Sequence, residues 1–480
     1  MFRKKCKALL LALTLVFLSG IQAAAFGKTD YVLDTDGKTH IPVPVCYRAQ
    51  TVYTDIGTGG TLNNPADIYT DKDCNLFIAD TDNNRIVKLA RDGSFIAEYT
   101  CGGTFSTPKG IFVSEQGDIF ISDSGNERIV HTDKNGKFIE EFTKPDSDML
   151  DKDMDFSVNR IRISNQGYLM MIKGTKFMAM DADNEFKGYI GSNKLGFSLK
   201  RTLLRIFASD EQKSKLLKDE PVSYNSFDIA QDGMIYAVTA EEQTSGQIRK
   251  INAVGENVYP VKVYGEQYYN EHTQKYNAPR FASIAVDSND MIYVLEQYSG
   301  KIYVYDQEGS MLCAFGGMGK IKGLFSSPTA IEVDESGNVY VLDSATGYIH
   351  IFTPTDFIKR VFKASGLYSA GEYQKSADVW KEVLQTDANY NQANLGYSRC
   401  LYKLGDNKNA EYYAELAEDK SVYSDAFSET RYEFFQNHFA LVVVIIAAVG
   451  AAITALAVFL RKTAARFRNR YYDERMKRER

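Results

Sequence analysis

The sequence is poor in the residues and motifs that build most enzyme active sites. It has only five histidines in 480 residues, and none of its six cysteines forms a CxxC pair, which excludes a zinc site of the usual spacing. It contains no GxSxG, P-loop, HExxH or EF-hand motif, so no local signature of a nucleophile, a nucleotide site or a calcium loop is present. We therefore predict no catalytic residues, no cofactor and no metal ligands.

Proline is also scarce, and basic charge is confined to one end. Ten prolines stand against 31 tyrosines and 28 phenylalanines, a composition that favours strands. The net charge is -6 although residues 461–480 carry nine Lys or Arg and only three Asp or Glu, so the remainder is more acidic than the total suggests. An acidic body has no electrostatic footprint for nucleic acid, which we exclude as a partner. At this length we expect two or more domains.

The N-terminus has the three parts of a secretory signal peptide. Basic residues at 3–5 precede an apolar run at 8–18 and the small residues Ala23, Ala24 and Ala25. We predict a signal peptide over 1–25, cleaved after Ala25, and a linker over 26–42. An uncleaved anchor is the alternative, although the apolar run is short for a membrane span. The five cysteines left after cleavage are widely spaced, which favours small buried residues over a disulfide framework.

A second apolar stretch lies near the C-terminus. Residues 439–460 carry no charge and, as a helix of about 1.5 Å per residue, are long enough to cross a bilayer. The basic tail at 461–480 marks the cytoplasmic side. These observations predict a single-pass protein of the cell membrane whose large N-terminal part is extracellular and whose C-terminus is cytoplasmic. A buried soluble helix is the alternative, but every face of the segment is apolar.

The body of the chain contains internal repeats. An offset of 43 residues relates Asp80 to Asp123 and Arg85 to Arg128, and the same offset also matches positions 83, 86 and 93 to 126, 129 and 136. Similar alternating apolar runs with Asn or Gly turns recur near residues 160, 228, 283 and 330. Six units of about four strands each indicate the blades of a β-propeller.

Two of these units carry a more specific pattern. Asp80-x-x-Asn83-x-Arg85-Ile86, and the same residues 43 positions later, resemble the signature of NHL repeats. The resemblance covers roughly residues 45–355, and the other four units lose the Arg. It implies a six-bladed propeller of the gluconolactonase-like and TolB-like group, in which the Asp and Arg hold a strand to its turn. It also implies relatives of several kinds: hydrolases and lyases that use a channel metal, and exported bacterial propellers linked to carbohydrate uptake.

A ring of blades must close on itself. The alternating segment 43–56 precedes the first full unit, and we predict that it supplies the outer strand of the last blade, which removes exposed sheet edges. The propeller is then expected over 43–358. A helical insertion is predicted over 192–220, as a lid, a membrane-surface helix or a helix packed on the side of the ring.

The segment 359–428 changes to a helical period. Gly371 and Gly405 are 34 residues apart, which is the tetratricopeptide period, and the surrounding pattern resembles about two such repeats. We expect this segment either to bind a peptide or a partner membrane protein, or to act as a rigid spacer. Two repeats are short for a stable solenoid, so we also expect them to lean on the propeller or on a partner.

Candidate site residues lie just before the apolar start of each innermost strand. By this criterion the channel positions are Asp67, Gly110, Arg160, Asp228, Ser283 and Ala330. Asp67, Arg160, Asp228 and Ser283 are predicted to line a site for a hydroxylated or charged ligand, with an unliganded, solvated channel as the alternative. Arg160 would repel a cation, and a hard metal requires six or more oxygen ligands, so a catalytic metal is disfavoured.

Together these features predict an all-β fold, a six-bladed β-propeller, followed by a tetratricopeptide-like α-helical segment and one transmembrane helix. The predicted function is a membrane-anchored extracellular module that binds an unknown extracellular ligand, a glycan or a peptide. The alternative is an extracellular gluconolactonase-like hydrolase with a metal in the propeller channel.

Overall fold

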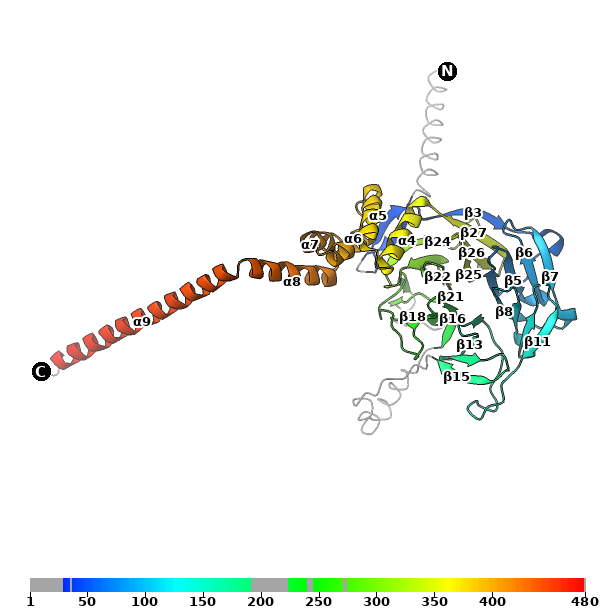
Figure 1. The fold of residues 1–480 in the computed structure, drawn as a ribbon, viewed down its shortest axis with the longest axis horizontal. Coiled ribbons are helices and arrows are strands. Elements are labelled where there is room, and N and C mark those ends of the chain that lie inside the picture. Colours follow the sequence, from blue (N-terminus) through cyan, green and yellow to red (C-terminus); the bar gives the residue numbers. More distant parts are fainter. Residues whose placement is uncertain (1–28, 35–36, 191–222, 240–244, 271–273, 479–480) are drawn as a thin grey trace, which may run out of the picture. The chain divides into compact units, whose positions relative to one another are not determined.

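A computed structural model describes residues 29–34, 37–190, 223–239, 245–270 and 274–478 (Figure 1). The predicted signal peptide and the predicted insertion at 192–220 lie outside these residues. The chain divides into two compact units, residues 1–393 and 394–480. The first unit contains the strands, arranged as blades around a central axis (Figure 1).

The first three blades are four-stranded antiparallel sheets. Blade 1 consists of β4 (Asp67–Thr70), β5 (Leu76–Asp80), β6 (Arg85–Leu89) and β7 (Phe95–Tyr99). Blade 2 consists of β8 (Pro108–Val113), β9 (Ile119–Asp123), β10 (Arg128–Thr132) and β11 (Phe138–Phe142). Blade 3 consists of β12 (Ile161–Ile163), β13 (Leu169–Lys173), β14 (Lys176–Met180) and β15 (Phe186–Ile190).

The next three blades complete a ring of six. Blade 4 consists of β16 (Tyr224–Ile229), β17 (Ile235–Thr239) and β18 (Ile248–Ile251), and the hairpin of β19 (Tyr268–Asn270) and β20 (Lys275–Asn277) follows it. Blade 5 contains β21 (Phe281–Val286), β22 (Ile292–Glu296), β23 (Lys301–Tyr305) and β24 (Met311–Gly316). Blade 6 contains β25 (Pro328–Val333), β26 (Val339–Asp343) and β27 (Tyr348–Pro354). Each innermost strand contacts the innermost strands of both neighbouring blades, which closes the ring.

The outer strand of blade 6 comes from the N-terminal side of the propeller. β3 (Tyr47–Tyr53) runs antiparallel to β27, from the pair Ile349–Tyr53 to the pair Pro354–Tyr47. This confirms the predicted closure, with narrower bounds than 43–56. β3 therefore covers the outer edge of β27 from Ile349 to Pro354.

The segment 26–42 was predicted to be a linker, and this is wrong for its described part. β1 (Thr29–Leu33) and β2 (His40–Pro44) form a hairpin that extends the sheet of blade 5 through the pair Tyr31–Ala314. The Asp30 carboxylate accepts hydrogen bonds from the backbone N–H groups of Cys46 and Tyr47, at 2.6 and 3.3 Å. The hairpin is therefore tied to the start of the closing strand.

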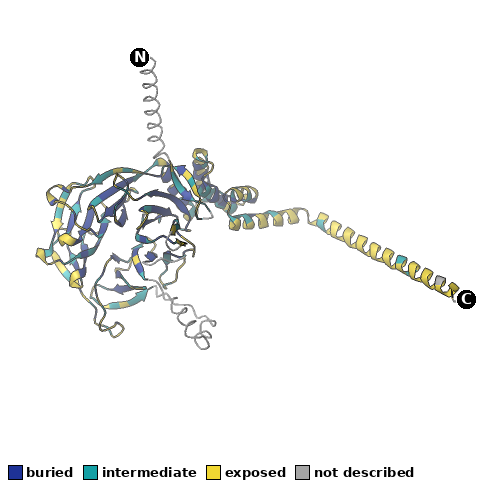
Figure 2. Ribbon diagram, turned by 180° about the vertical axis from the view of Figure 1, so that it is seen from behind, coloured by how far each residue is buried: buried dark blue, intermediate teal, exposed yellow. Residues whose placement is uncertain are grey.

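The core lies between the faces of neighbouring blades (Figure 2). Every residue of the central strands β5 and β9 is buried. The reason is that each blade is covered on both sides by its neighbours, as in packed β-sheets. Among the described cysteines, four are buried and Cys101 is partly exposed, and none of the five forms a disulfide, as expected for small core residues.

The NHL-like residues form the same clamp in blades 1 and 2. Arg85 Nε donates to the buried Asp80 Oδ2 at 2.7 Å, and Asp80 Oδ1 accepts the backbone N–H of Asn63 at 2.7 Å. In blade 2, Arg128 Nε donates to Asp123 Oδ2 at 2.8 Å, and the backbone N–H of Ser106 donates to Asp123 Oδ1 at 2.7 Å. Each pair encloses a short 3-10 turn, η2 (Thr81–Asn83) or η4 (Ser124–Asn126). Two further 3-10 turns are η1 (Gly57–Gly59) and η3 (Cys101–Gly103).

Helices follow the propeller, so the chain as a whole is not all-β. α4 (Asp356–Ser369) and α5 (Tyr373–Thr386) form a hairpin in the first unit, joined by Ser376 Oγ, which donates to the Ala364 carbonyl at 2.7 Å. The ring of Phe362 in α4 packs edge-on against Tyr293 of blade 5, and Tyr390, which follows α5, donates to the carbonyl of Leu312 in the same blade at 2.7 Å. The first helices therefore lean on the propeller, as expected.

The described residues of the second unit form helices joined by short turns. α6 (Asn391–Lys403) reaches into it and is followed by α7 (Asn407–Leu416), α8 (Lys420–Asn437) and α9 (Phe439–Arg478). Gly371 and Gly405 both have left-handed φ, +78° and +82°, and each is followed by an N–H that bonds a carbonyl five residues earlier. This turn repeats at 34 residues, while the assignment to tetratricopeptide repeats stays a prediction.

Within the described residues, α9 is the one helix long and apolar enough to cross a membrane. Its side chains are exposed along the length of the helix (Figure 2). The predicted span 439–460 and most of the basic tail lie in this one continuous helix.

Candidate functional site

The six inner strands can be aligned by the turns that follow them. In each turn the N–H of one residue bonds the carbonyl four positions later, beginning at residues 71, 114, 164, 230, 287 and 334. Four positions before these residues lies a first ring of inward positions: Asp67, Gly110, Arg160, Ser226, Ser283 and Ala330. Two positions before them lies a second ring: Tyr69, Phe112, Arg162, Asp228, Ala285 and Glu332.

Five of the six predicted channel positions fall in the first ring, and the placement of Asp228 is wrong. The sequence Asp228-Ile229 had been matched to Asp67-Ile68, but Ser226 is the true counterpart of Asp67. β16 pairs with β17 through Ser226 and Val238, as β4 pairs with β5 through Asp67 and Ala79. The shift is two residues, which keeps Asp228 on the inward side of the strand but one layer deeper.

Several first-ring side chains hold neighbouring blades together. Asp67 Oδ2 accepts the N–H of Ile111 at 3.2 Å, and Ser283 Oγ accepts the N–H of Ile331 at 3.3 Å. Ser226 Oγ accepts the N–H of Ile284 at 3.3 Å. In every case the N–H donor belongs to a neighbouring blade, where it directly follows that blade's own first-ring residue. These polar groups therefore have a structural use, whatever else they bind.

Gly110 is in the first ring for a steric reason. A Cβ atom at this position would lie 2.7 Å from the carbonyl oxygen of Asn159 in the adjacent blade. Any side chain here would push blades 2 and 3 apart, so Gly110 marks a close backbone approach and contributes no functional group to the channel.

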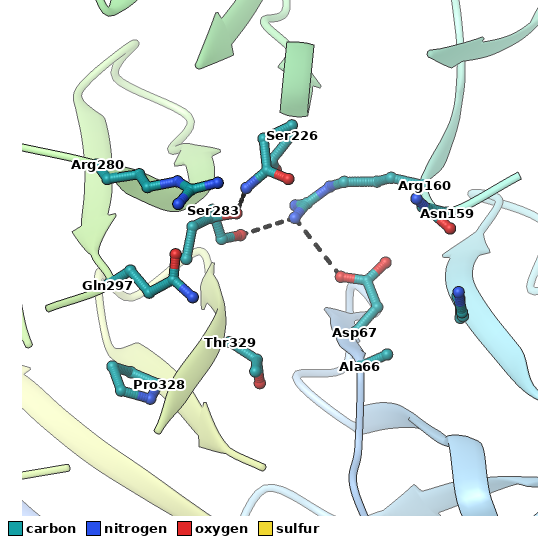
Figure 3. A pocket seen from close by; sticks show the side chains of 13 residues that line it. Ala66, Asp67, Asn159, Arg160, Ser226, Arg280, Ser283, Gln297, Pro328 and Thr329 are labelled. Carbon is teal, nitrogen blue, oxygen red and sulfur yellow. Dashed lines mark hydrogen bonds and ion pairs between the residues drawn. The ribbon is translucent and has the colours of Figure 1, made fainter. Parts of the chain in front are cut away.

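The side chain of Arg160 extends from blade 3 across the channel to blade 5 (Figure 3). Its Nη1 donates to Ser283 Oγ at 2.8 Å, and its Nη2 donates to the Ile284 carbonyl at 3.1 Å. Nη1 also lies 3.6 Å from Asp67 Oδ1, an oxygen with no hydrogen-bond partner. The structure thus brings together three of the four predicted ligand-binding residues, Asp67, Arg160 and Ser283.

The fourth predicted residue, Asp228, is bound to an arginine that the sequence analysis missed. Arg162 Nε donates to Asp228 Oδ1 at 2.7 Å, and Arg162 Nη2 lies 3.7 Å from Glu332 Oε2. Arg162 is 2 % exposed and Glu332 is 7 % exposed. Both could have been found from the alternation of side chains along a strand. Arg162 and Glu332 stand two residues after the predicted channel positions Arg160 and Ala330, so they lie on the same face of their strands.

The two rings form one buried charge cluster with one carboxyl in excess. Arg160 and Arg162 face the carboxyl groups of Asp67, Asp228 and Glu332. Burial, with a further contribution from Asp228, raises the pKa of Glu332 to about 8, although Arg162 and Arg160 oppose the shift. The nearby carboxylates raise the pKa of Arg162 against the effect of burial. Burial lowers the pKa of Arg160, but a guanidinium does not lose its proton in a protein, so both arginines lie in the channel as cations.

A cavity of about 390 Å³ opens at the end where the inner strands begin (Figure 3). Its floor is formed by Asp67, Arg160 and Ser283. Its wall contributes two further basic residues, Lys109 and Arg280, with hydroxyl and amide side chains from Asn159, Asn225, Ser226, Gln297 and Thr329. We call this space the basic cavity. It offers many hydrogen-bonding groups and an excess of positive charge over the single carboxylate.

Asp228 lines a different cavity, of about 280 Å³, at the end where the inner strands finish. The arginines lie between the two cavities. Of the four predicted ligand-binding residues, three therefore line the basic cavity and Asp228 alone lines the cavity at the other end.

A metal-dependent hydrolase was the alternative reading. Among the residues that the structure describes, no three His, Cys, Asp or Glu side chains are grouped so as to hold a metal ion. The positions that converge at the axis of the channel include two guanidinium groups, which repel a cation.

No protein-family model and no curated protein matches this chain. Among solved structures, virginiamycin B lyase from Staphylococcus aureus is 14 % identical, with 68 % of this chain and 88 % of that chain covered and a TM-score of 0.39. A putative gluconolactonase is 12 % identical, with coverages of 68 % and 98 % and a TM-score of 0.42. A Bacteroides thetaiotaomicron protein of unknown function is 10 % identical, with coverages of 66 % and 80 % and a TM-score of 0.44. These are distant similarities of fold, and the six-bladed propeller assigned here rests on the strand topology.

Proposed function

We propose that this protein is a membrane-anchored binding module whose propeller holds an acidic glycan in the basic cavity. The observation that carries the proposal is the composition of that cavity: three basic side chains and several hydroxyl and amide groups surround one carboxylate. Carboxylate groups of the glycan would pair with Lys109 and Arg280, and sugar hydroxyls would donate to Asp67 Oδ1. A volume of about 390 Å³ suits one or two sugar residues.

The membrane part of the proposal rests on the composition of α9. Its first 22 residues carry no charge, and nine basic residues follow in the last 20 residues of the chain. This order favours insertion with the propeller outside and the C-terminus in the cytoplasm. The helical segment between propeller and span would then be available to contact a partner membrane protein.

The ligand proposal is tested by titrating the full-length protein in detergent with trigalacturonate and with the neutral sugar maltotriose. We expect trigalacturonate to bind and maltotriose to bind at least about tenfold more weakly, a difference of about 1.4 kcal/mol. Lys109→Ala is expected to weaken trigalacturonate binding about tenfold, because it removes a charge at the cavity wall.

Lys134→Ala is the matched control, since Lys134 is an exposed lysine of the same blade outside the cavity, and it should change the affinity less than twofold. Equal affinity for the acidic and neutral sugars, or binding of an acidic peptide such as triglutamate in preference to both, would contradict the proposal.

The topology is tested separately on intact cells treated with an external protease. We expect the propeller to be degraded, while an epitope placed after Arg480 stays protected until the membrane is permeabilised. The reverse pattern, with the C-terminal epitope removed first, would overturn the orientation and leave the ligand test unaffected.

A further inference from the structure

The cavity at the opposite end of the channel is strongly acidic. Its volume is about 280 Å³, and we call it the acidic cavity. It is lined by one lysine, Lys72, and by seven carboxyl groups, those of Asp71, Glu115, Asp228, Asp287, Glu332, Asp334 and Glu335. Two cations outside the lining offset part of this charge, Lys88 at 3.8 Å from Asp71 and Arg91 at 3.6 Å from Asp334.

Three of these seven carboxylates cap turns of the propeller. Asp71, Asp287 and Asp334 each cap a turn by accepting two backbone N–H groups of the same turn through Oδ1. Their Oδ2 atoms also accept hydrogen bonds, from an asparagine or a tyrosine side chain. These residues contribute negative potential to the cavity, but their oxygens are already engaged.

Glu332 differs from them. It is 7 % exposed, its Oε1 has a single weak bond from Thr70 at 3.5 Å, and its Oε2 has no hydrogen-bond partner. The closest cation, Arg162, is 3.7 Å from Oε2 and is already bonded to Asp228 at 2.7 Å. A buried acceptor that has no donor lowers the stability of the folded protein. Glu332 Oε2 therefore differs from the carboxylate oxygens that cap turns, because its burial has no structural explanation.

We infer that the acidic cavity binds a small alkylammonium cation, with the Glu332 carboxyl group, which lines the cavity, as its hydrogen-bond acceptor. One added positive charge would balance the buried cluster of two arginines and three carboxyl groups. An ammonium group brings the N–H donors that the Glu332 carboxyl group lacks. The alkyl part would lie against the apolar wall, which includes Tyr69, Ile229 and Val286.

A hard metal ion fits this cavity less well. Calcium or magnesium needs six or more oxygens, whereas the oxygens of Asp71, Asp287 and Asp334 are held in their turns. An ammonium ion needs fewer acceptors and gains from the diffuse negative potential of the remaining carboxylates.

The site also predicts that binding releases a proton. The groups that face Glu332 are Arg160, Arg162, Asp67, Asp228 and Tyr69. With a pKa of about 8, Glu332 carries its proton for most of the time at pH 7. A cation beside the Glu332 carboxyl group stabilises its ionised form and lowers this pKa, so the proton passes to the buffer.

The experiment is calorimetric titration of the full-length protein in detergent with 1,5-diaminopentane at pH 7, in phosphate and in Tris. We expect binding with release of up to one proton, seen as a difference in heat between the two buffers. Glu332→Gln should weaken binding at least about tenfold and abolish the buffer dependence. Glu335→Gln, an exposed carboxyl of the same cavity, is the matched control and should change the affinity about twofold at most.

An Nα-acetyllysine amide titration identifies the source of the ammonium group. Tighter binding of the diamine points to free amines, and tighter binding of the lysine derivative points to lysine side chains. Amine binding with no proton release by the unaltered protein would overturn the inference, and this outcome needs no variant to fold. So would calcium binding that excludes the amine and depends on Glu332.

Discussion

Asp80→Ala is expected to lower the free energy of unfolding of the propeller by about 3–5 kcal/mol. The carboxylate is fully buried and holds the Arg85 guanidinium at 2.7 Å, the N–H of Asn63 at 2.7 Å and the Asn83 side-chain amide at 2.8 Å. Its removal leaves three donors without their acceptor and one partly buried cation without its closest partner. The measurement is urea unfolding followed by circular dichroism.

Two further variants show whether the clamp is responsible. Asp123→Ala should match Asp80→Ala, because Asp123 makes the same contacts in blade 2. Glu98 also pairs with Arg85, at 2.8 Å, but its side chain is 47 % exposed, so Glu98→Gln should cost about 1 kcal/mol or less. A loss for Asp80→Ala no larger than for Glu98→Gln would show that the NHL-like residues are not structural.

Arg162→Met is expected to destabilise the propeller by a similar amount, about 3–5 kcal/mol near neutral pH. Methionine keeps much of the side-chain volume but removes the donor that binds Asp228 at 2.7 Å and the positive charge beside Glu332. It also removes the bonds from Arg162 Nη1 to the carbonyls of Ile111 and Ile161, at 3.3 and 2.9 Å. Thermal unfolding by calorimetry measures the loss.

The cost of Arg162→Met should depend on pH. In the unaltered protein the folded state holds the Glu332 proton up to a pKa of about 8, against an ordinary value of 4.5. The stabilisation from this proton is complete below pH 4.5 and is lost as the pH rises to 8. Arg162 lowers the pKa of Glu332, so its absence raises that pKa further. Both folded proteins hold the Glu332 proton below about pH 8, so the stability gap widens as the pH rises through about 8 and above it.

Arg91→Met is the control for this series. Arg91 also pairs with a channel-end carboxylate, Asp334 at 3.6 Å, but its side chain is 53 % exposed. Its replacement should change stability by about 1 kcal/mol or less. If Arg162→Met were as stable as the unaltered protein from pH 5 to pH 8, the buried charge cluster would contribute nothing to folding.

The fold was largely accessible from the sequence because its elements repeat. The 43-residue offset and the NHL-like residues of the first two blades identified the propeller, and the alternation near residue 50 identified the closing strand. The hairpin at residues 29–44 was missed. Asp34 and Gly37 do indicate a turn, but the short segments on either side of it match no other repeat of the chain, so they were not identified as strands. Local pattern alone did not show which sheet they would join.

The candidate site was only partly accessible. Asp67, Arg160 and Ser283 were found by their position before an apolar residue, but the two-residue shift of Asp228 could not be seen without the turn that follows β16. Arg162 was missed because a charged residue within a short apolar strand was not expected to face the axis. Its burial is possible only because Asp228 arrives from the next blade, 66 residues later. Such a partner is not visible in local sequence.

The pairing of β3 with β27 has a consequence for how the protein is made. The two strands begin 301 residues apart, at Tyr47 and Tyr348, so a ribosome must complete nearly three quarters of the chain before the ring can shut. Until then the nascent blades expose unpaired backbone and apolar faces, which makes this the interval in which chaperones matter most.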